Sequence, residues 1–236
     1  MRCCGLGKTR ILEAIGVTKT YRMGKIAVPV LRNIDFGAAK GDFIALQGPS
    51  GSGKTTLLNI LGGLDSPSSG EVWIEGVNTT KMGEKRLSVI RCRRIGFVFQ
   101  FYNLIPNMSA LNNVELPMIF ARSPKEPRLQ KAELLLQTVG LAQKLLHTSA
   151  ELSAGEQQRV AIARALANDP AIVLMDEPTG NLDRENTTNI MRLVEELNES
   201  KGQTFILTTH STVIAKSANK VVQLRDGKLQ DILACK

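Results

Sequence analysis

The chain has 236 residues, 43% hydrophobic and 22% charged, with 30 Lys and Arg against 22 Asp and Glu, which gives a net charge of +8. This composition supports a buried core and excludes a disordered chain, a collagen-like chain and a disulfide scaffold. No apolar run approaches the roughly 18–20 residues that cross a bilayer. We therefore expect that the chain itself spans no membrane.

The elements predicted by hydrophobic periodicity alternate between strands and helices. Strands are predicted at 11–17, 43–46, 72–74, 171–175 and 204–209, helices at 54–61, 124–145, 156–167 and 184–199, and a hairpin at 221–229. Strands that alternate with helices indicate an α/β fold with a mostly parallel sheet.

The four cysteines and the net charge bear on compartment and partners. Cys3, Cys4, Cys92 and Cys235 have neither metal-ligand nor disulfide spacing, so we interpret them as free thiols in a reducing cytosol, with lipidation of Cys3 or Cys4 as an alternative. The excess of cations suits either nucleic acid or a surface near anionic lipids. Aromatic residues, at 4%, are scarce as base-stacking platforms, and we expect no nucleic acid partner.

The strongest local pattern is the segment 48–55, Gly-Pro-Ser-Gly-Ser-Gly-Lys-Thr, which fits G-x-x-x-x-G-K-[ST] between a predicted strand and a predicted helix. Glycines let backbone N–H groups approach phosphate oxygens, and the positive end of the helix faces the same phosphates. Lys54 is placed to neutralise the β- and γ-phosphates, and the Thr55 hydroxyl to bind Mg²⁺. A glycine-rich turn is the alternative, but a chance match in such a chain has odds of about one in a hundred.

Two carboxylates, Asp176 and Glu177, directly follow the predicted strand 171–175. Ligands bind at this edge of open α/β sheets, so we expect Asp176 to hold Mg²⁺ through water and Glu177 to polarise the attacking water. An acidic helix cap is the alternative, which loses weight beside the phosphate-binding pattern. His210 follows the strand 204–209 and is expected to hydrogen-bond the γ-phosphate or that water, whereas His147 is given no role.

The segment 152–159, Leu-Ser-Ala-Gly-Glu-Gln-Gln-Arg, contains the S-x-x-E pattern of a capping box from Ser153 to Glu156. Its simplest interpretation is the start of an amphipathic helix. An exposed helix N-terminus approached through small residues is also an anion site, and the anion could belong to a nucleotide held by another subunit.

With these motifs together, the chain resembles the ATP-binding subunits of ABC transporters from about residue 11 to residue 232. The segment 48–55 is similar to the Walker A loop, 174–177 to the end of Walker B, 153–156 to the signature motif and 180–183 to the D-loop. Gln100 resembles the Q-loop glutamine, His210 the switch histidine and Tyr21 the aromatic residue that stacks on adenine. The segments 95–100, 103–106 and 113–117 resemble the lipoprotein-release and macrolide-efflux type.

The resemblance implies one domain, 1–236, with a P-loop NTPase core of the RecA type at about 11–100 and 167–236. It also implies an N-terminal antiparallel β subdomain and a helical subdomain at about 101–166. Glu177, His210 and Lys54 would be catalytic, and Mg²⁺ would bind at Thr55, Gln100 and Asp176. The implied nucleotide-binding residues are Tyr21, Gly48, Ser50, Gly51, Ser52, Gly53, Lys54, Thr55, Thr56, Gln100, Ser153, Gly155 and Asp183.

The same resemblance implies that two copies close head-to-tail around two ATP molecules, each held by the Walker A loop of one copy and the signature helix of the other. Hydrolysis would reopen the dimer, and the helical subdomain would receive the coupling helix of a transmembrane permease subunit. The chain would then work at the cytoplasmic face of the membrane, in export or extraction of lipoproteins, peptides or drugs.

One residue departs from the family pattern, because Ala154 stands where the signature motif usually has glycine. A methyl group there would crowd the partner's γ-phosphate or restrict the backbone. We therefore expect activity to persist, with ATP-driven dimerisation weaker than in a glycine version.

Two other classes compete with a transporter subunit. A non-transport ATPase of the same family would act on nucleic acid or the ribosome. Its chromosome and repair members insert a long coiled coil or a zinc module between the two motifs, and no heptad run lies between Lys54 and Ser153 here. Its translation factors carry two cassettes on one chain. A P-loop kinase is the other class, and it lacks both a signature motif and a switch histidine.

Overall fold

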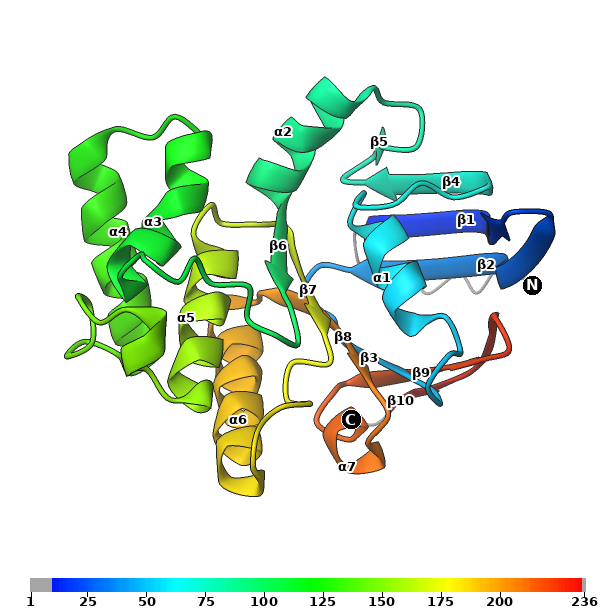
Figure 1. The fold of residues 1–236 in the computed structure, drawn as a ribbon. Helices are drawn as coiled ribbons and strands as arrows, with labels where there is room; N and C mark the ends of the chain where they lie inside the picture. Colours follow the sequence, from blue (N-terminus) through cyan, green and yellow to red (C-terminus); the bar gives the residue numbers. More distant parts are fainter. Residues whose placement is uncertain (1–9, 235–236) are drawn as a thin grey trace.

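The computed structural model describes residues 10–234, in which two β-sheets are packed together with helices around them (Figure 1). Cys3, Cys4 and Cys235, and with them the lipidation hypothesis, lie outside the described residues. Cys92 is a free thiol, as predicted.

The described residues form ten strands and eight helices, one of which is a 3₁₀-helix. The strands are β1 (Arg10–Met23), β2 (Ile26–Ala39), β3 (Phe43–Gln47), β4 (Ser69–Ile74), β5 (Val77–Asn78), β6 (Ile95–Val98), β7 (Ile172–Asp176), β8 (Thr204–Thr209), β9 (Lys220–Arg225) and β10 (Lys228–Ala234). The helices are α1 (Lys54–Leu61), α2 (Glu84–Arg94), α3 (Ala110–Phe120), α4 (Lys125–Thr138), the 3₁₀-helix η1 (Ser149–Glu151), α5 (Ala154–Leu166), α6 (Arg184–Lys201) and α7 (Thr212–Ala215).

The larger sheet has the order β10-β9-β3-β8-β7-β6, in which every pairing except that of β10 with β9 is parallel. The mostly parallel α/β core is therefore confirmed. Both faces of this sheet are covered, because consecutive residues of β3 enter different cores. Phe43 and Ala45 join one core, and Ile44 and Leu46 join the other. Such strands are nearly continuous apolar runs, which is why the sequence shows them clearly.

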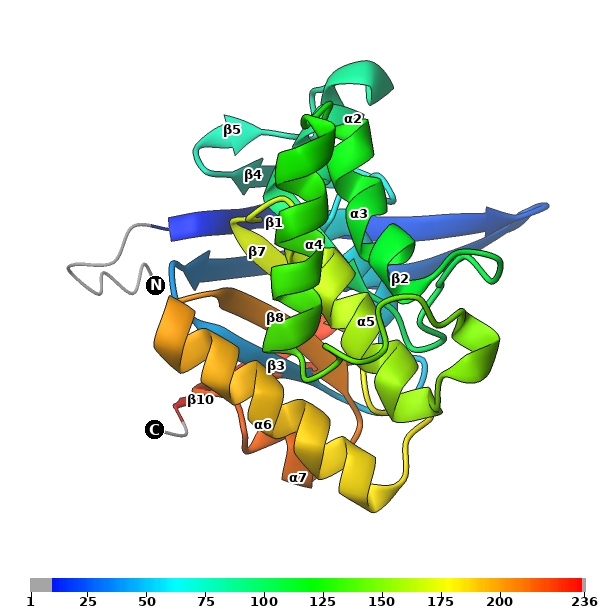
Figure 2. The same ribbon diagram turned by 90° about the vertical axis from the view of Figure 1, so that its left-hand side faces the viewer.

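The smaller sheet, β2-β1-β4-β5, is antiparallel and forms the expected N-terminal β subdomain. Its core-facing residues pack with those of α1 against one face of the larger sheet. The residues of α3, α4, α5 and α6 pack against the other face. Figure 2 shows these four helices in front of the sheets. The α6 stripe predicted from the sequence, Ile190, Leu193, Val194 and Leu197, is buried there.

Several boundaries differ from the sequence predictions for local reasons. The helix predicted at 124–145 ends at Thr138, since Gly140 adopts a left-handed φ of 77° and turns the chain. The helix predicted at 156–167 begins two residues earlier, because Ser153 caps it. The predicted hairpin is confirmed, with φ of 49° at Asp226 and 71° at Gly227, as a tight two-residue turn requires.

Seven elements were not predicted: the short β5, β6, η1 and α7, and the longer β2, α2 and α3. β2 is exposed over its first four residues, so buried and exposed residues do not alternate along that part of the strand. α2 buries no side chain, so it has no apolar stripe. α3 carries Pro117 within it, which the sequence-based reasoning takes as a helix breaker.

The parallel strands bring three separate sequence segments to one edge of the larger sheet. β3 leads into the loop before α1, β7 ends at Asp176, and β8 ends just before His210. β8 lies between β3 and β7, with Thr208 beside Asp176 and Thr209 beside Gln47. This edge carries the candidate site.

Candidate functional site

The loop between β3 and α1, residues 48–53, is named the phosphate loop here, and its glycines are required by its packing. A β-carbon on Gly48 would lie 2.2 Å from the carbonyl oxygen of Leu224, and one on Gly53 2.9 Å from Leu31 Cδ2. Gly51 and Gly53 also have φ of 77° and 100°, which side chains disfavour. At its glycines the loop therefore presents backbone to whatever approaches it.

Lys54, the first residue of α1, is almost fully buried beneath this loop. Its Nζ donates to the carbonyl oxygens of Gly48 and Pro49, both at 2.9 Å, and lies 4.0 Å from Glu177 Oε1. A buried ammonium group is stable only with such partners. Its charge is thus fixed directly under the loop.

The start of α1 fits an anion. Gly53, its N-cap, gives no side-chain cap, and the first turn holds no acidic residue. Ser52 Oγ is buried and meets no hydrogen-bond partner among the described residues. Free backbone N–H groups, an unpartnered hydroxyl and a positive helix end are the donors that phosphate oxygens require. The triphosphate of ATP therefore fits the residues present.

A carboxylate and a hydroxyl suited to Mg²⁺ lie next to the loop. Asp176 Oδ1 accepts from Thr55 Oγ1 at 3.0 Å and from Thr208 Oγ1 at 2.7 Å. Across residues 10–234, no three His, Cys, Asp or Glu side chains gather as a metal site. Mg²⁺ is commonly held by one or two protein oxygens together with phosphates and water, so this pair fits it.

Glu177 is held in a strained backbone conformation at the same edge. Its φ is 42°, and its N–H donates to Thr208 Oγ1 at 2.9 Å. Its Oε2 lies 3.4 Å from Nδ1 of His210, a largely exposed side chain. Left-handed backbone at a non-glycine residue is uncommon and clusters at functional sites. This backbone conformation places the Glu177 carboxylate between Lys54 and His210.

Gln100 lies against the D-loop. Its carbonyl oxygen accepts from Asn181 Nδ2 at 2.9 Å, and a β-carbon on Gly180 would lie 2.8 Å from Gln100 Nε2. In the part of the chain that the structure describes, no hydrogen bond joins Gln100 to Thr55 or Asp176. Its place beside the metal stays a prediction, whereas its contact with the D-loop is observed.

Tyr21, on β1, is oriented by two charged neighbours. Its hydroxyl donates to Asp65 Oδ2 at 2.7 Å, and Lys19 Nζ lies 4.7 Å from its ring centroid. Burial and the hydrogen bond to Asp65 raise the pKa of Tyr21. Burial opposes ionisation of Asp65, but hydrogen bonds from Lys19 and Tyr21 hold the pKa of that carboxyl below its usual value. The ring is partly exposed and can stack on a base.

The signature motif forms the predicted capping box at the start of α5. The Ser153 N–H donates to Glu156 Oε2 at 2.8 Å, and the Glu156 N–H donates to Ser153 Oγ at 3.3 Å. Ser153 and Ala154 are exposed, and Ala154 has ordinary helical backbone. The structure therefore gives no backbone reason for glycine at 154. The two expected effects of the Ala154 methyl group, on the backbone and on a partner's phosphate, both stay predictions.

Gly155 and Asp183 are joined by a residue that sequence reasoning missed. A β-carbon on Gly155 would lie 2.4 Å from Asn186 Oδ1, and Asn186 donates twice to Asp183. Asp183 caps α6, and these hydrogen bonds hold the pKa of its carboxyl below the usual value. No local pattern signals this contact, because it depends on how α5 and α6 pack.

Of the remaining predicted residues, Ser50 is exposed on the phosphate loop and Thr56 is half-buried in the first turn of α1. The structure thus brings Lys54, Thr55, Asp176, Glu177 and His210 together at one edge. No hydrogen bond or ion pair among residues 10–234 links Ser153, Gly155 or Asp183 to that edge.

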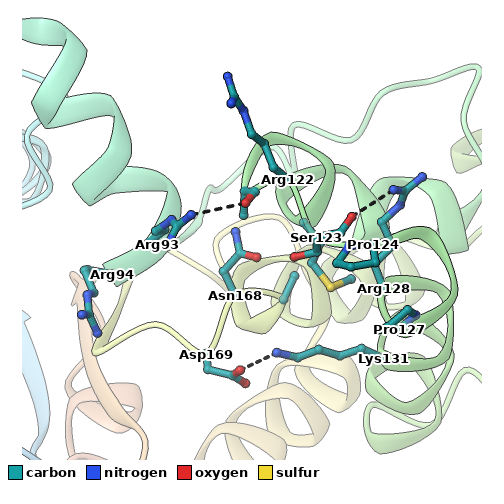
Figure 3. A pocket seen from close by; sticks show the side chains of 13 residues that line it. Arg93, Arg94, Arg122, Ser123, Pro124, Pro127, Arg128, Lys131, Asn168 and Asp169 are labelled. Carbon is teal, nitrogen blue, oxygen red and sulfur yellow. Dashed lines mark hydrogen bonds and ion pairs between the residues drawn. The ribbon is translucent and has the colours of Figure 1, made fainter.

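A second hollow lies away from this edge and is strongly basic. It has a volume of about 630 Å³ and lies where the ends of α2 and α3 approach the start of α4 (Figure 3). Its cations are Arg93, Arg94, Arg122, Arg128 and Lys131. Several are already paired, Arg94 with Glu75, Arg128 with Glu115 and Lys131 with Asp169. Among the described residues, Arg93 donates to a carbonyl oxygen, that of Ala121, at 3.4 Å, and forms no ion pair. We name this hollow the basic pocket.

Comparisons with known proteins agree on one family. The family model described as "ABC transporter" matches residues 31–180. The chain is 47% identical to the lipoprotein-releasing system ATP-binding protein LolD of Saccharophagus degradans, over 94% of this chain and 97% of that protein. It is 46% identical to the macrolide export ATP-binding/permease protein MacB of Syntrophobacter fumaroxidans, over 93% of this chain and 31% of that longer protein.

Solved structures give the same answer for the fold. The ATP-binding cassette MJ0796 of Methanocaldococcus jannaschii, solved as a dimer in a post-hydrolysis state with ADP and Pi, superposes with a TM-score of 0.88. It is 42% identical, over 95% of this chain and 99% of that chain. Within residues 10–234, no helix has both the length and the apolar character needed to cross a membrane.

Proposed function

The chain belongs to the ABC transporter family as an ATP-binding, ATP-hydrolysing subunit, and from this premise we propose how its residues bind ATP, hydrolyse it and act on a membrane partner. One observation supports the proposal most directly. Glu177 lies within 4.0 Å of both the buried ammonium of Lys54 and the imidazole of His210, beside the phosphate loop. A base, a cation and a second donor thus surround the place where a γ-phosphate fits.

The triphosphate is held by the phosphate loop and the start of α1. The N–H groups there donate to phosphate oxygens, and Lys54 neutralises charge on the β- and γ-phosphates. Ser50, Ser52 and Thr56 add hydroxyl contacts. Tyr21 stacks on the adenine with the ring face that Lys19 leaves open.

Thr55 and Asp176 would hold Mg²⁺, with Gln100 as a further ligand from the Q-loop, and the ion would supply charge neutralisation and polarisation of the γ-phosphate. Glu177 orients the attacking water and accepts its proton, while His210 donates a hydrogen bond to the γ-phosphate. The strained backbone at Glu177 keeps its carboxylate in place for this work.

Two copies close head-to-tail, so that the second copy covers each nucleotide. Ser153, Gly155 and Asp183 are the residues of each copy that meet the ATP of the other. Support comes from the exposed, small-residue start of α5, which offers N–H groups and a positive helix end to a phosphate. The solved cassette dimer with ADP and Pi supports the same arrangement.

The work of this dimer is export or extraction of a lipoprotein, peptide or drug, through transmembrane permease subunits and at the cytoplasmic face of the membrane. The names of two relatives, one a lipoprotein-releasing subunit and one a macrolide exporter, support this direction. The helical subdomain, about 101–166, receives the permease.

The basic pocket is the part of that subdomain's border best suited to a carboxylate-bearing permease segment. Arg93 and Arg122 meet no carboxylate among the described residues, unlike their neighbours. Arg122 also has a left-handed φ of 62°, a conformation that glycine would adopt more easily. An arginine kept there at a cost in backbone strain supports a role for its side chain.

Two experiments test the proposal. Calorimetric titration of the wild-type chain with ATP and Mg²⁺ should give a binding heat, and its absence would refute the whole scheme. The tagged chain should also retain a membrane protein when purified from solubilised membranes of its own host. Arg122→Gly should keep the fold and reduce that retention, whereas Arg192→Gln, on the exposed face of α6, should not. Equal retention by both variants would remove the basic pocket from the interface.

A further inference from the structure

The starts of α5 and α6 lie close together, and one side chain fills the space between them. Figures 1 and 2 both show the two helices side by side. At this contact a β-carbon on Gly155 would lie 2.4 Å from Asn186 Oδ1 and 2.8 Å from Asn186 Cγ. Neither distance is tolerated between real atoms, so the Asn186 amide occupies the space that a side chain at 155 would need.

Asn186 is not free to move out of the way. Its backbone N–H donates to Asp183 Oδ1 at 2.8 Å, and its Nδ2 donates to Asp183 Oδ2 at 2.9 Å. Both carboxylate oxygens of the α6 cap are therefore engaged by this one residue. Rotating the amide away from α5 would break its side-chain hydrogen bond to the D-loop.

We propose that Asn186 is a positioning residue that holds the D-loop against the signature helix, and that Gly155 lacks a side chain because Asn186 occupies that space. The inference rests on the proposed function, in which Ser153 and Asp183 both meet the partner's ATP. Asn186 touches no nucleotide itself. It makes the two segments one rigid unit, so that a displacement of the signature helix is also a displacement of the D-loop.

The arrangement separates two explanations for a glycine in the signature motif. If glycine is needed at 155 because the partner's phosphate lies close, an added methyl group would weaken dimerisation whatever residue stands at 186. If it is needed because Asn186 fills the space, the methyl group displaces the Asn186 amide and with it Asp183. A shorter side chain at 186 then removes this steric clash. Ala154, the neighbour of Gly155, is exposed.

The test is a double-mutant cycle on the full chain with Gly155→Ala, Asn186→Ala and the double variant. Thermal unfolding is measured without nucleotide, and ATP-driven dimerisation and steady-state ATPase with it. Gly155→Ala alone should lower Tm and weaken dimerisation at least about tenfold, as expected from a steric conflict that breaks a hydrogen bond. The double variant should recover the Tm of Asn186→Ala and most of the dimer affinity.

Asn186→Ala alone should leave the affinity of the single chain for ATP within about twofold and lower kcat about tenfold, because the D-loop loses its support. Asn186→Asp is the isosteric variant. It should lower kcat as much as Asn186→Ala does, because it places two carboxylates next to each other. Asn189→Ala, the same change at another half-buried position of α6, is the control. If Asn189→Ala and Asn186→Ala had the same kcat, the proposal would be overturned.

The outcomes also separate this inference from the proposed function. A wild-type chain that neither binds ATP nor dimerises would refute the function, while the Tm cycle would still report the contact. A wild-type chain that dimerises, with Gly155→Ala equally impaired in the presence and absence of Asn186, would overturn the inference alone. In that case the methyl group would be meeting the partner and not its own chain.

Discussion

Two regions of the molecule differ in how far one chain alone supplies the contacts of the proposed site. One is the edge of the larger sheet beside the phosphate loop, and the other is the start of α5 with the signature motif, called the signature end. At the edge, Lys54 is tied to two loop carbonyls, Asp176 accepts from two hydroxyls, and Glu177 lies between Lys54 and His210. At the signature end, Ser153 and Ala154 are exposed, and Ser153 exchanges cap hydrogen bonds with Glu156 of the same helix.

This difference indicates a division of work. A preorganised set of donors binds without further ordering, so the edge is able to hold ATP in a single chain. In the proposed dimer, the signature end offers a positive helix end to a nucleotide that the other copy holds. Variants at the edge should therefore affect binding or chemistry in the single chain, and variants at the signature end should affect only the closed dimer.

The largest effect is expected from Lys54→Ala. It removes the buried ammonium group that donates to two carbonyl oxygens of the phosphate loop, and with it a charge-assisted contact to phosphate. We expect ATP affinity, measured by calorimetry, to fall by about 100-fold or more. Lys40→Ala, at an exposed site, should bind normally. Near-normal affinity of Lys54→Ala would show that the loop backbone alone holds the triphosphate.

Glu177→Gln should separate binding from chemistry. The amide keeps the size of the carboxylate but does not accept a proton from water, so phosphate release should fall by about 10²–10⁴-fold. ATP affinity should persist, and the unhydrolysed ATP should trap a dimer visible by analytical ultracentrifugation. Normal hydrolysis in this variant would remove Glu177 from the water-activating role.

Tyr21→Ala should weaken ATP binding by about 1–3 kcal/mol through loss of stacking. Tyr21→Phe is the matched variant, because it keeps the ring and loses only the hydrogen bond to Asp65. We expect the phenylalanine variant to bind ATP almost as well as the wild type, measured by the same calorimetry. An equal loss in both variants would mean that the hydroxyl, and not the ring, supports the base.

What the sequence could predict follows the same division. The phosphate loop, Asp176 and Glu177 were predictable because each is a local pattern at the end of a buried strand, and parallel strands bring such ends together. The Tyr21 contact with Asp65 joins residues 44 positions apart, and the Asn186 contact with Gly155 joins two helices. Such contacts depend on how distant segments pack together, and this packing leaves no periodic pattern in the sequence.

The missed elements have a related cause. Periodicity detects a helix or a strand only where one face is buried. α2 buries no side chain and β2 is exposed over its first four residues, so both lack the pattern. The same limit applies to Ala154, whose departure from the family pattern suggested a constraint on the backbone. Residue 154 has ordinary helical backbone in this chain, so we expect the effect of its methyl group mainly where a second copy would contact it.

Ala154→Gly should therefore have the smallest effect and show it only in the dimer. We expect unchanged ATP affinity in the single chain, and dimerisation in the Glu177→Gln background tighter by at most about tenfold, or about 1.4 kcal/mol. Glycine also weakens a helix relative to alanine, so Tm should stay equal or fall slightly. Unchanged dimer affinity and turnover would mean that the methyl group at 154 meets nothing in the closed state. The positive end of α5, and not the space above Ala154, would then set how tightly the second copy closes.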